Sequence, residues 1–113
     1  MAKFRFGATA KEARAIVWAL ACFLEDTQKE LGAVRRQYNR TKLLHRQLEH
    51  AHDVARNFGQ DSVADMIGEA LNRVSDNMTY LLCQMLDLTQ QLETALLAYG
   101  LAEKMEPCLD QME

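Results

Sequence analysis

Two histidines and several acidic residues near the middle of this chain have the types and spacing that could bind a metal ion. Glu49 and His52 are three residues apart, as in the Glu-x-x-His motifs of di-iron bundles, which place both side chains on one helix face. Glu69 would lie at the same level on a second helix. A dimeric di-iron or zinc-binding bundle is therefore a minor alternative. We expect no metal, because the motif occurs once and the residues predicted to face His45 and His52 are apolar.

Other kinds of catalytic chemistry have no signature in this sequence. There is no glycine-rich phosphate loop, no nucleophile elbow and no cysteine–histidine pair at a plausible spacing. The three cysteines, Cys22, Cys83 and Cys108, match no zinc pattern, and their odd number favours a reducing, cytoplasmic location. We therefore expect a protein that is not an enzyme and needs no cofactor.

The elements that would position these residues are indicated by two heptad stripes. The stripes occupy positions 17, 20, 24, 27, 31, 34, 38, 41, 45, 48, 52 and 55, and positions 64, 67, 71, 74, 78, 81, 85, 88, 92, 95, 99 and 102. Both advance by alternating steps of three and four, which is the period of supercoiled helices. Folding the chain back at Gly59 pairs 17 with 102 and 55 with 64, and the numbers of every pair sum to 119. The pattern predicts an all-α fold, an antiparallel two-helix hairpin that turns at Gly59.

Capping signals set the expected bounds of the elements. The sequence predicts one domain over 1–113, with a helix over 9–57, a turn over 58–61, a helix over 62–105 and a tail over 106–113. Thr9 would cap the first helix and Asp61 or Ser62 the second. The second helix is expected to end early, because Pro107 disfavours helical geometry at the preceding residue.

The charge is divided between the two halves of the chain. Residues 1–57 hold 11 Lys or Arg against 6 Asp or Glu, and residues 58–113 hold 2 against 10. A basic helix beside an acidic one explains this asymmetry, so we expect no nucleic-acid partner. The longest uncharged apolar run is ten residues, which is too short for a membrane span. A cleaved signal peptide is not expected either, because the first heptad stripe continues through the candidate cleavage site.

The end of the hairpin away from the turn carries more apolar residues than two facing stripes can cover. The apolar residues outside the stripes are Ile16, Trp18, Cys22, Phe23, Leu96, Leu97 and Leu101. The register places those of one helix beside those of the other. A continuous apolar surface of this kind is typical of an association site. We expect a partner interface here, through which two hairpins pair into a four-helix bundle. The partner could be a second copy or a different hairpin.

Two short motifs give the chain a resemblance to a known family. Tyr99-Gly100-Leu101-Ala102-Glu103 has the Tyr-x-x-x-Glu pattern near the end of the second helix, and Asn57-Phe58-Gly59 lies at the turn. The chain resembles the W-x-G family of helical hairpins in type VII secretion, with the turn glycine present and the tryptophan absent. The resemblance implies a divergent secretion substrate, or a partner or targeting factor for a larger secreted protein. It implies that Tyr99 and Glu103 form the export signal of a signal-peptide-independent route. The open alternative is a cytoplasmic coiled-coil adaptor unrelated to secretion.

Overall fold

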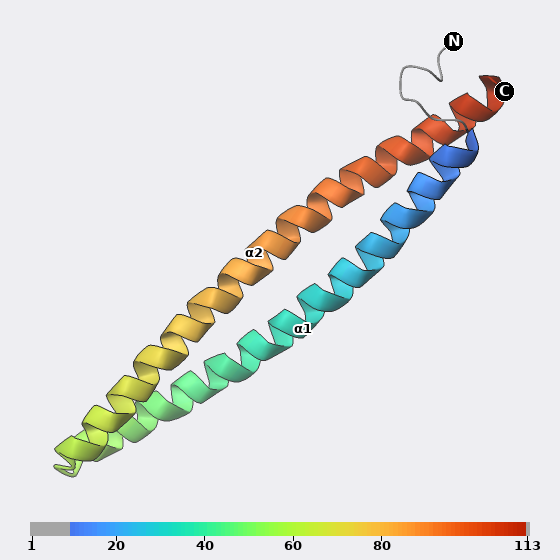
Figure 1. Ribbon diagram of the computed structural model, residues 1–113. Coiled ribbons are helices and arrows are strands. Elements are labelled where there is room, and N and C mark those ends of the chain that lie inside the picture. Colours follow the sequence, from blue (N-terminus) through green and yellow to red (C-terminus); the bar gives the residue numbers. More distant parts are fainter. Residues whose placement is uncertain (1–9, 113) are drawn as a thin grey trace. The chain divides into compact units, whose positions relative to one another are not determined.

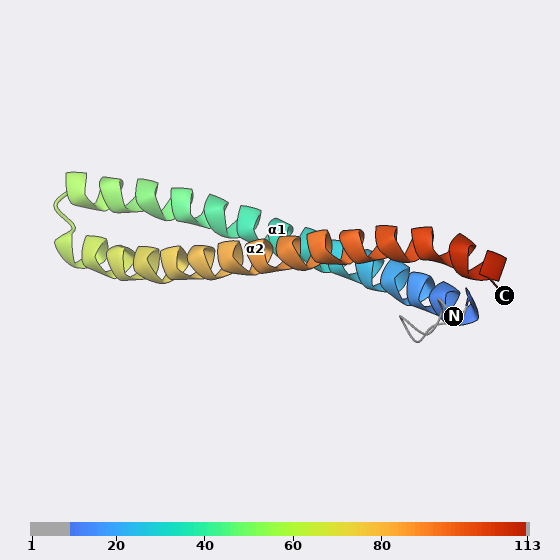
Figure 2. The same ribbon diagram turned by 90° about the horizontal axis from the view of Figure 1, so that it is seen from above.

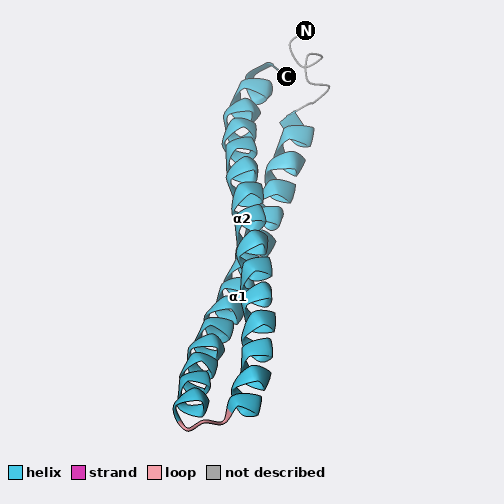
Figure 3. Ribbon diagram, turned by 90° about the vertical axis from the view of Figure 1, so that its left-hand side faces the viewer, coloured by secondary structure: helices cyan, strands magenta, loops and turns pink. Residues whose placement is uncertain are grey.

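The computed structural model describes the backbone of residues 10–112 and the side chains of residues 11–104. This part of the chain consists of two long helices, α1 (Ala10–Asn57) and α2 (Asp61–Met112), and contains no strand (Figure 1). Within the described residues a single short loop joins the two helices (Figure 3). The structure confirms the all-α class and the turn at Gly59. Thr9, the predicted cap of α1, lies outside the described residues.

The chain packs as two units, which we describe separately. The turn unit comprises residues 31–87, and the terminal unit comprises residues 1–30 and 88–113. In the turn unit, the adjoining parts of α1 and α2 run antiparallel from the loop (Figure 2). Within each unit the packing is between one segment of α1 and one segment of α2.

The turn is closed by backbone hydrogen bonds around a left-handed glycine. Gly59 has φ of 71°, a conformation that side chains with a Cβ rarely adopt. The Gln60 amide donates to the Ala55 carbonyl at 2.8 Å, and the Gly59 amide donates to the Arg56 carbonyl at 3.1 Å. This pair of bonds is a Schellman motif, which satisfies carbonyls that the end of α1 would otherwise leave unpaired. The tight reversal fixes which residues of α1 and α2 face each other.

The two predicted heptad stripes face each other, and we call the layer between them the seam; it is the core of the turn unit. Val34, Ala55, Ala64 and Leu81 are buried, and the remaining seam positions of this unit are half-buried. The side chain of His45 contacts Ser75, at 3.2 Å between Nε2 and Oγ, one residue from its predicted partner at position 74. A register shifted by a heptad would not allow this contact. The structure therefore confirms the predicted register in the turn unit.

The terminal unit uses the same pattern. Leu24, Thr27, Leu88, Ala95 and Ala102 are buried, and all of them are predicted seam positions. Ala13 is buried too, and it lies one four-residue step before the first predicted position. Thr27 is a polar residue in this core, but no buried side-chain nitrogen or oxygen in the described part of the chain lacks a hydrogen-bond partner. The seam thus accounts for the core of this unit as well.

The two ends of α2 differ from the sequence-based expectation. The helix begins at Asp61, and the N-cap is Gln60, whose carbonyl accepts the Ala64 amide at 2.9 Å. Asp61 and Ser62 are therefore first-turn residues and not caps. The helix continues through Pro107 to Met112, so the predicted end near 105 is wrong, and residues 106–112 are helical instead of forming a tail. Residue 113, the last of the predicted tail, lies outside the described residues. Proline removes one backbone donor, at a cost of about 3 kcal/mol in a helix interior, which lowers the stability of that turn without ending the helix here.

Candidate interaction surfaces

The terminal unit leaves exposed the apolar residues that were predicted to lie outside the seam. The exposed side chains are Ile16, Trp18, Phe23, Leu96, Leu97 and Leu101, and Cys22 is half-buried. Trp18 is 72% exposed and Leu97 is 71% exposed. Large side chains with this exposure contribute little to the packing of one hairpin. The surface is therefore present as expected, and its role in binding stays a prediction.

Leu43, Leu82 and Leu86 are further exposed apolar residues, and they belong to the turn unit. Cys22 and Cys83 are free thiols, and Cys108 lies outside the described side chains.

Tyr99 and Glu103 are neighbours on α2, one helical turn apart, as expected from their spacing. Tyr99 is half-buried in the seam, whereas Glu103 is exposed. The Tyr99 hydroxyl donates a hydrogen bond to the Glu103 carboxylate, and this bond raises the pKa of the phenol. The negative charge of Glu103 and partial burial raise that pKa further. The two side chains thus form a hydrogen-bonded pair at the edge of the seam.

The histidines and glutamates of the metal hypothesis do not form a ligand cluster. Among the described residues no group of three or more His, Cys, Asp or Glu side chains is arranged to hold a metal ion. Glu49 contacts His45 instead of His52, at 2.9 Å between Oε1 and Nδ1. His52 has its Nδ1 4.0 Å from Asp53, and its Nε2 lies beside Gly68. The single chain therefore does not bring Glu49, His52 and Glu69 together.

His45 has a polar partner at each ring nitrogen. A carboxylate only accepts hydrogen bonds, so Nδ1 donates to Glu49. In the neutral ring Nε2 then accepts from the Ser75 hydroxyl of α2. These contacts explain how a histidine is accommodated at a seam position.

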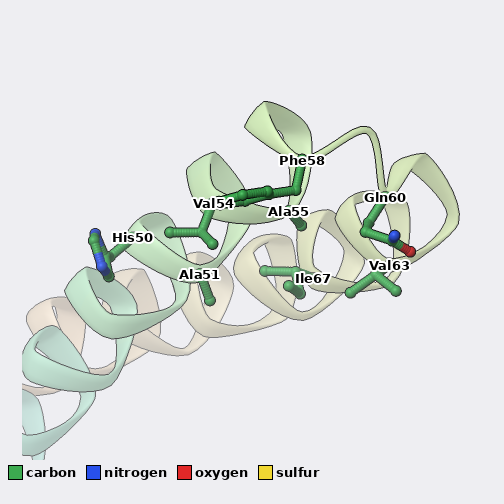
Figure 4. A pocket seen from close by; sticks show the side chains of 8 residues that line it. All are labelled: His50, Ala51, Val54, Ala55, Phe58, Gln60, Val63 and Ile67. Carbon is green, nitrogen blue, oxygen red and sulfur yellow. The ribbon is translucent and has the colours of Figure 1, made fainter.

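An apolar groove beside the turn was not anticipated from the sequence. Figure 4 shows its lining side chains, which come from the end of α1, the connecting loop and the start of α2. They are His50, Ala51, Val54, Ala55, Phe58, Gln60, Val63 and Ile67. Phe58 is 77% exposed, and its ring extends toward Val54 one turn earlier on α1. The lining is almost entirely apolar. The signal that could have revealed this groove is the apolar character of Ala51, Phe58 and Val63, which flank the seam on one side.

A second depression in the turn unit is polar and has no apolar side chain larger than alanine. It is lined by His52, Arg56, Asp61, Ala64 and Asp65. Its lining carries charges of both signs, with Arg56 against Asp61 and Asp65. It offers no concentrated charge for a ligand.

Comparisons with known proteins do not extend these observations. No family model, no curated protein and no solved structure matches this chain. Among the described residues, neither helix is both long and apolar enough to cross a bilayer. The function must therefore be argued from the surfaces described above.

Proposed function

We propose that this chain is a non-enzymatic helical interaction protein that binds another helical hairpin through its terminal unit. The observation that carries this proposal is the exposure of Trp18, Phe23 and Leu97 beside an already complete seam. Burying one such side chain is worth about 1.5–3 kcal/mol, so several exposed together favour association. Two hairpins that pair along their helices form a four-helix bundle, which covers this kind of surface.

We further propose that the interaction serves type VII secretion. Supporting this, Tyr99 and Glu103 form a linked pair on α2, at the place where the W-x-G family carries its export signal. The partner would be a second hairpin, either another copy or part of a larger secreted protein. The chain would then be made in the cytoplasm and exported without a cleaved signal peptide, alone or with its partner.

A cytoplasmic adaptor is the second candidate, and two observations favour it. The turn has Asn57 where the family pattern has tryptophan, and its aromatic residue, Phe58, lies one position later. The Tyr99 hydroxyl is also engaged by Glu103, which accounts for both residues by local structure alone. An adaptor would use the same apolar surface without any export step.

Copurification from the native host tests the proposed interaction. The chain should retain a helical partner, and the double variant Trp18→Ser/Leu97→Ser should lose it while keeping its helical content by circular dichroism. Leu43→Ser is the matched control, because Leu43 is 56% exposed and lies in the other unit. A wild-type chain that recovers neither a partner nor a second copy would contradict the proposal. A partner secreted with the chain would favour the secretion role over the adaptor.

A further inference from the structure

The turn unit carries its own unpaired apolar surface, made of residues that the terminal unit does not contain. Phe58, Val54 and Val63 line the groove beside the turn, and all three are exposed. Met66, one turn after Ser62 on α2, is 70% exposed. These residues contribute little to the seam, so the packing of one hairpin does not explain them. A large exposed aromatic next to aliphatic side chains is typical of a protein interface.

The charge of the turn unit indicates what could cover this groove. Its α1 segment, residues 31–57, holds six Lys or Arg against two Asp or Glu, a net charge of +4. Its remaining part, residues 58–87, holds one Arg against four Asp and one Glu, a net charge of −4. The unit as a whole has no net charge, but positive charge is concentrated on its α1 segment and negative charge on its α2 segment. The turn unit of a second copy is therefore complementary in charge only when the α1 segment of each copy faces the α2 segment of the other.

We propose that the turn-unit groove docks onto the same groove of a second copy of this chain, with both turns at the same end. A twofold axis parallel to the helices sets each +4 segment against a −4 segment, and it brings the two Phe58 side chains to one end of the interface. The opposite arrangement, with the copies running in opposite directions, sets α1 against α1 and two +4 segments face each other. Charge complementarity of this kind selects the arrangement more than it adds affinity.

The apolar residues match in this arrangement. With the turns at one end, residue n of α1 lies level with residue 119 minus n of the second copy's α2. Val54 is then level with Asp65 and Met66 of the second copy. Phe58 is level with the first turn of the second copy's α2. Arg40 lies within one helical turn of the second copy's Asp76, at the outer rim of the interface. Apolar side chains therefore meet near the turn, and opposite charges meet farther along.

Cysteine cross-linking of the full chain tests the arrangement. In a background with Cys22, Cys83 and Cys108 replaced by serine, Gln60→Cys should form a disulfide-linked dimer on mild oxidation. Asn72→Cys is the matched control, because Asn72 is exposed on α2 of the same unit but does not line the groove, and it should cross-link much less. In the opposite arrangement with the same two grooves in contact, the two copies of residue 60 would be about 15 Å apart, because the groove extends from residue 60 back to His50. A disulfide does not span that distance. Equal cross-linking at both positions, or none at Gln60→Cys, would overturn the proposal.

Sedimentation of substitution variants tests the groove itself. Phe58→Ser should raise the dissociation constant of the dimer by about tenfold or more, because it removes an aromatic side chain that the interface would bury. Leu86→Ser removes a side chain that is 61% exposed and does not line the groove, and it should change the constant by about twofold at most. A wild-type chain that stays monomeric at high micromolar concentration contradicts the inference. Self-association that is insensitive to Phe58→Ser contradicts it too, but that result is compatible with the proposed association through Trp18 and Leu97.

Discussion

At the scale of single residues, glycines illustrate how one substitution can act in opposite directions. Gly59 has a positive φ, so a Cβ there is strained whatever the surrounding space. Gly100 lies inside α2, and a Cβ built on it meets no atom within 4 Å. The same change, glycine to alanine, therefore meets backbone strain at one position and gains helix propensity at the other.

We expect Gly59→Ala to lower the free energy of unfolding by about 1–2 kcal/mol. We expect Gly100→Ala to raise it by up to about 1 kcal/mol, because alanine loses less conformational entropy on forming a helix. Urea denaturation followed by circular dichroism measures both. Equal effects of the same sign would show that backbone conformation does not decide stability at Gly59.

Tyr99 gives the second prediction at this scale. Its phenol should titrate above the ordinary tyrosine pKa, and Glu103→Ala should bring that pKa back toward the ordinary value. Ultraviolet difference titration of the wild type against Tyr99→Phe isolates this one phenol among three tyrosines. Tyr99→Phe is suitable because the ring stays in the seam. An unchanged titration curve in Glu103→Ala would contradict the hydrogen bond.

The sign of the accompanying stability effect follows from the raised pKa. The neutral phenol is favoured in the folded chain, so the Tyr99–Glu103 bond contributes stability at neutral pH, below the pKa of unfolded tyrosine. That contribution is lost as pH rises through the raised pKa of the folded chain. The stability difference between the wild type and Glu103→Ala should therefore shrink at alkaline pH.

At the scale of elements, the seam should carry most of the packing energy of each unit. Leu81 is 2% exposed, whereas Leu82, the next residue on α2, is 46% exposed. We expect Leu81→Ala to lower the free energy of unfolding by about 2–4 kcal/mol, because it leaves a cavity between the helices. Leu82→Ala is the adjacent control and should cost less than about 1 kcal/mol. Similar losses for both would contradict the heptad register.

The seam could be predicted from the sequence because its signal is long and repeated. Every predicted seam position in the described part is buried or half-buried, including polar ones such as Thr27 and His45. The glycine at the turn added a single fixed point from which the register followed. A pattern of this length leaves few alternative pairings.

The ends of α2 were harder to predict because they depend on single residues. Gln60 is the N-cap through its backbone carbonyl, which any residue can supply, so the side chains of Asp61 and Ser62 were a misleading signal. Pro107 disfavours a helix by a local cost, which the rest of a 52-residue helix can outweigh. The groove beside Phe58 was missed because its residues only flank the seam, where apolar side chains are common.

At the scale of the whole molecule, export is the function that most needs a direct test. Glu103 is exposed and lies outside the seam, so Glu103→Ala should fold and associate as the wild type does. If the Tyr99–Glu103 pair is an export signal, this variant should accumulate in cells and decrease in the culture supernatant, together with any partner. Glu93→Ala is the control, because Glu93 is also exposed on α2 and lies outside the motif. Unchanged export of Glu103→Ala, or a wild type that stays in the cells, would favour the adaptor.

All pairs of facing seam positions are centred on the turn, and this sets the order in which they can form during synthesis. Ala55 and Ala64 are made almost together, so the packing beside the turn can form at once. Position 17 must wait for position 102, which at about 5–20 residues per second takes roughly 4–17 s. During this interval the first part of α1, with Trp18 and Phe23, has no seam partner in its own chain. The residues made first are therefore covered last, and the segment that carries the exposed aromatic side chains is the one that meets chaperones and binding partners earliest.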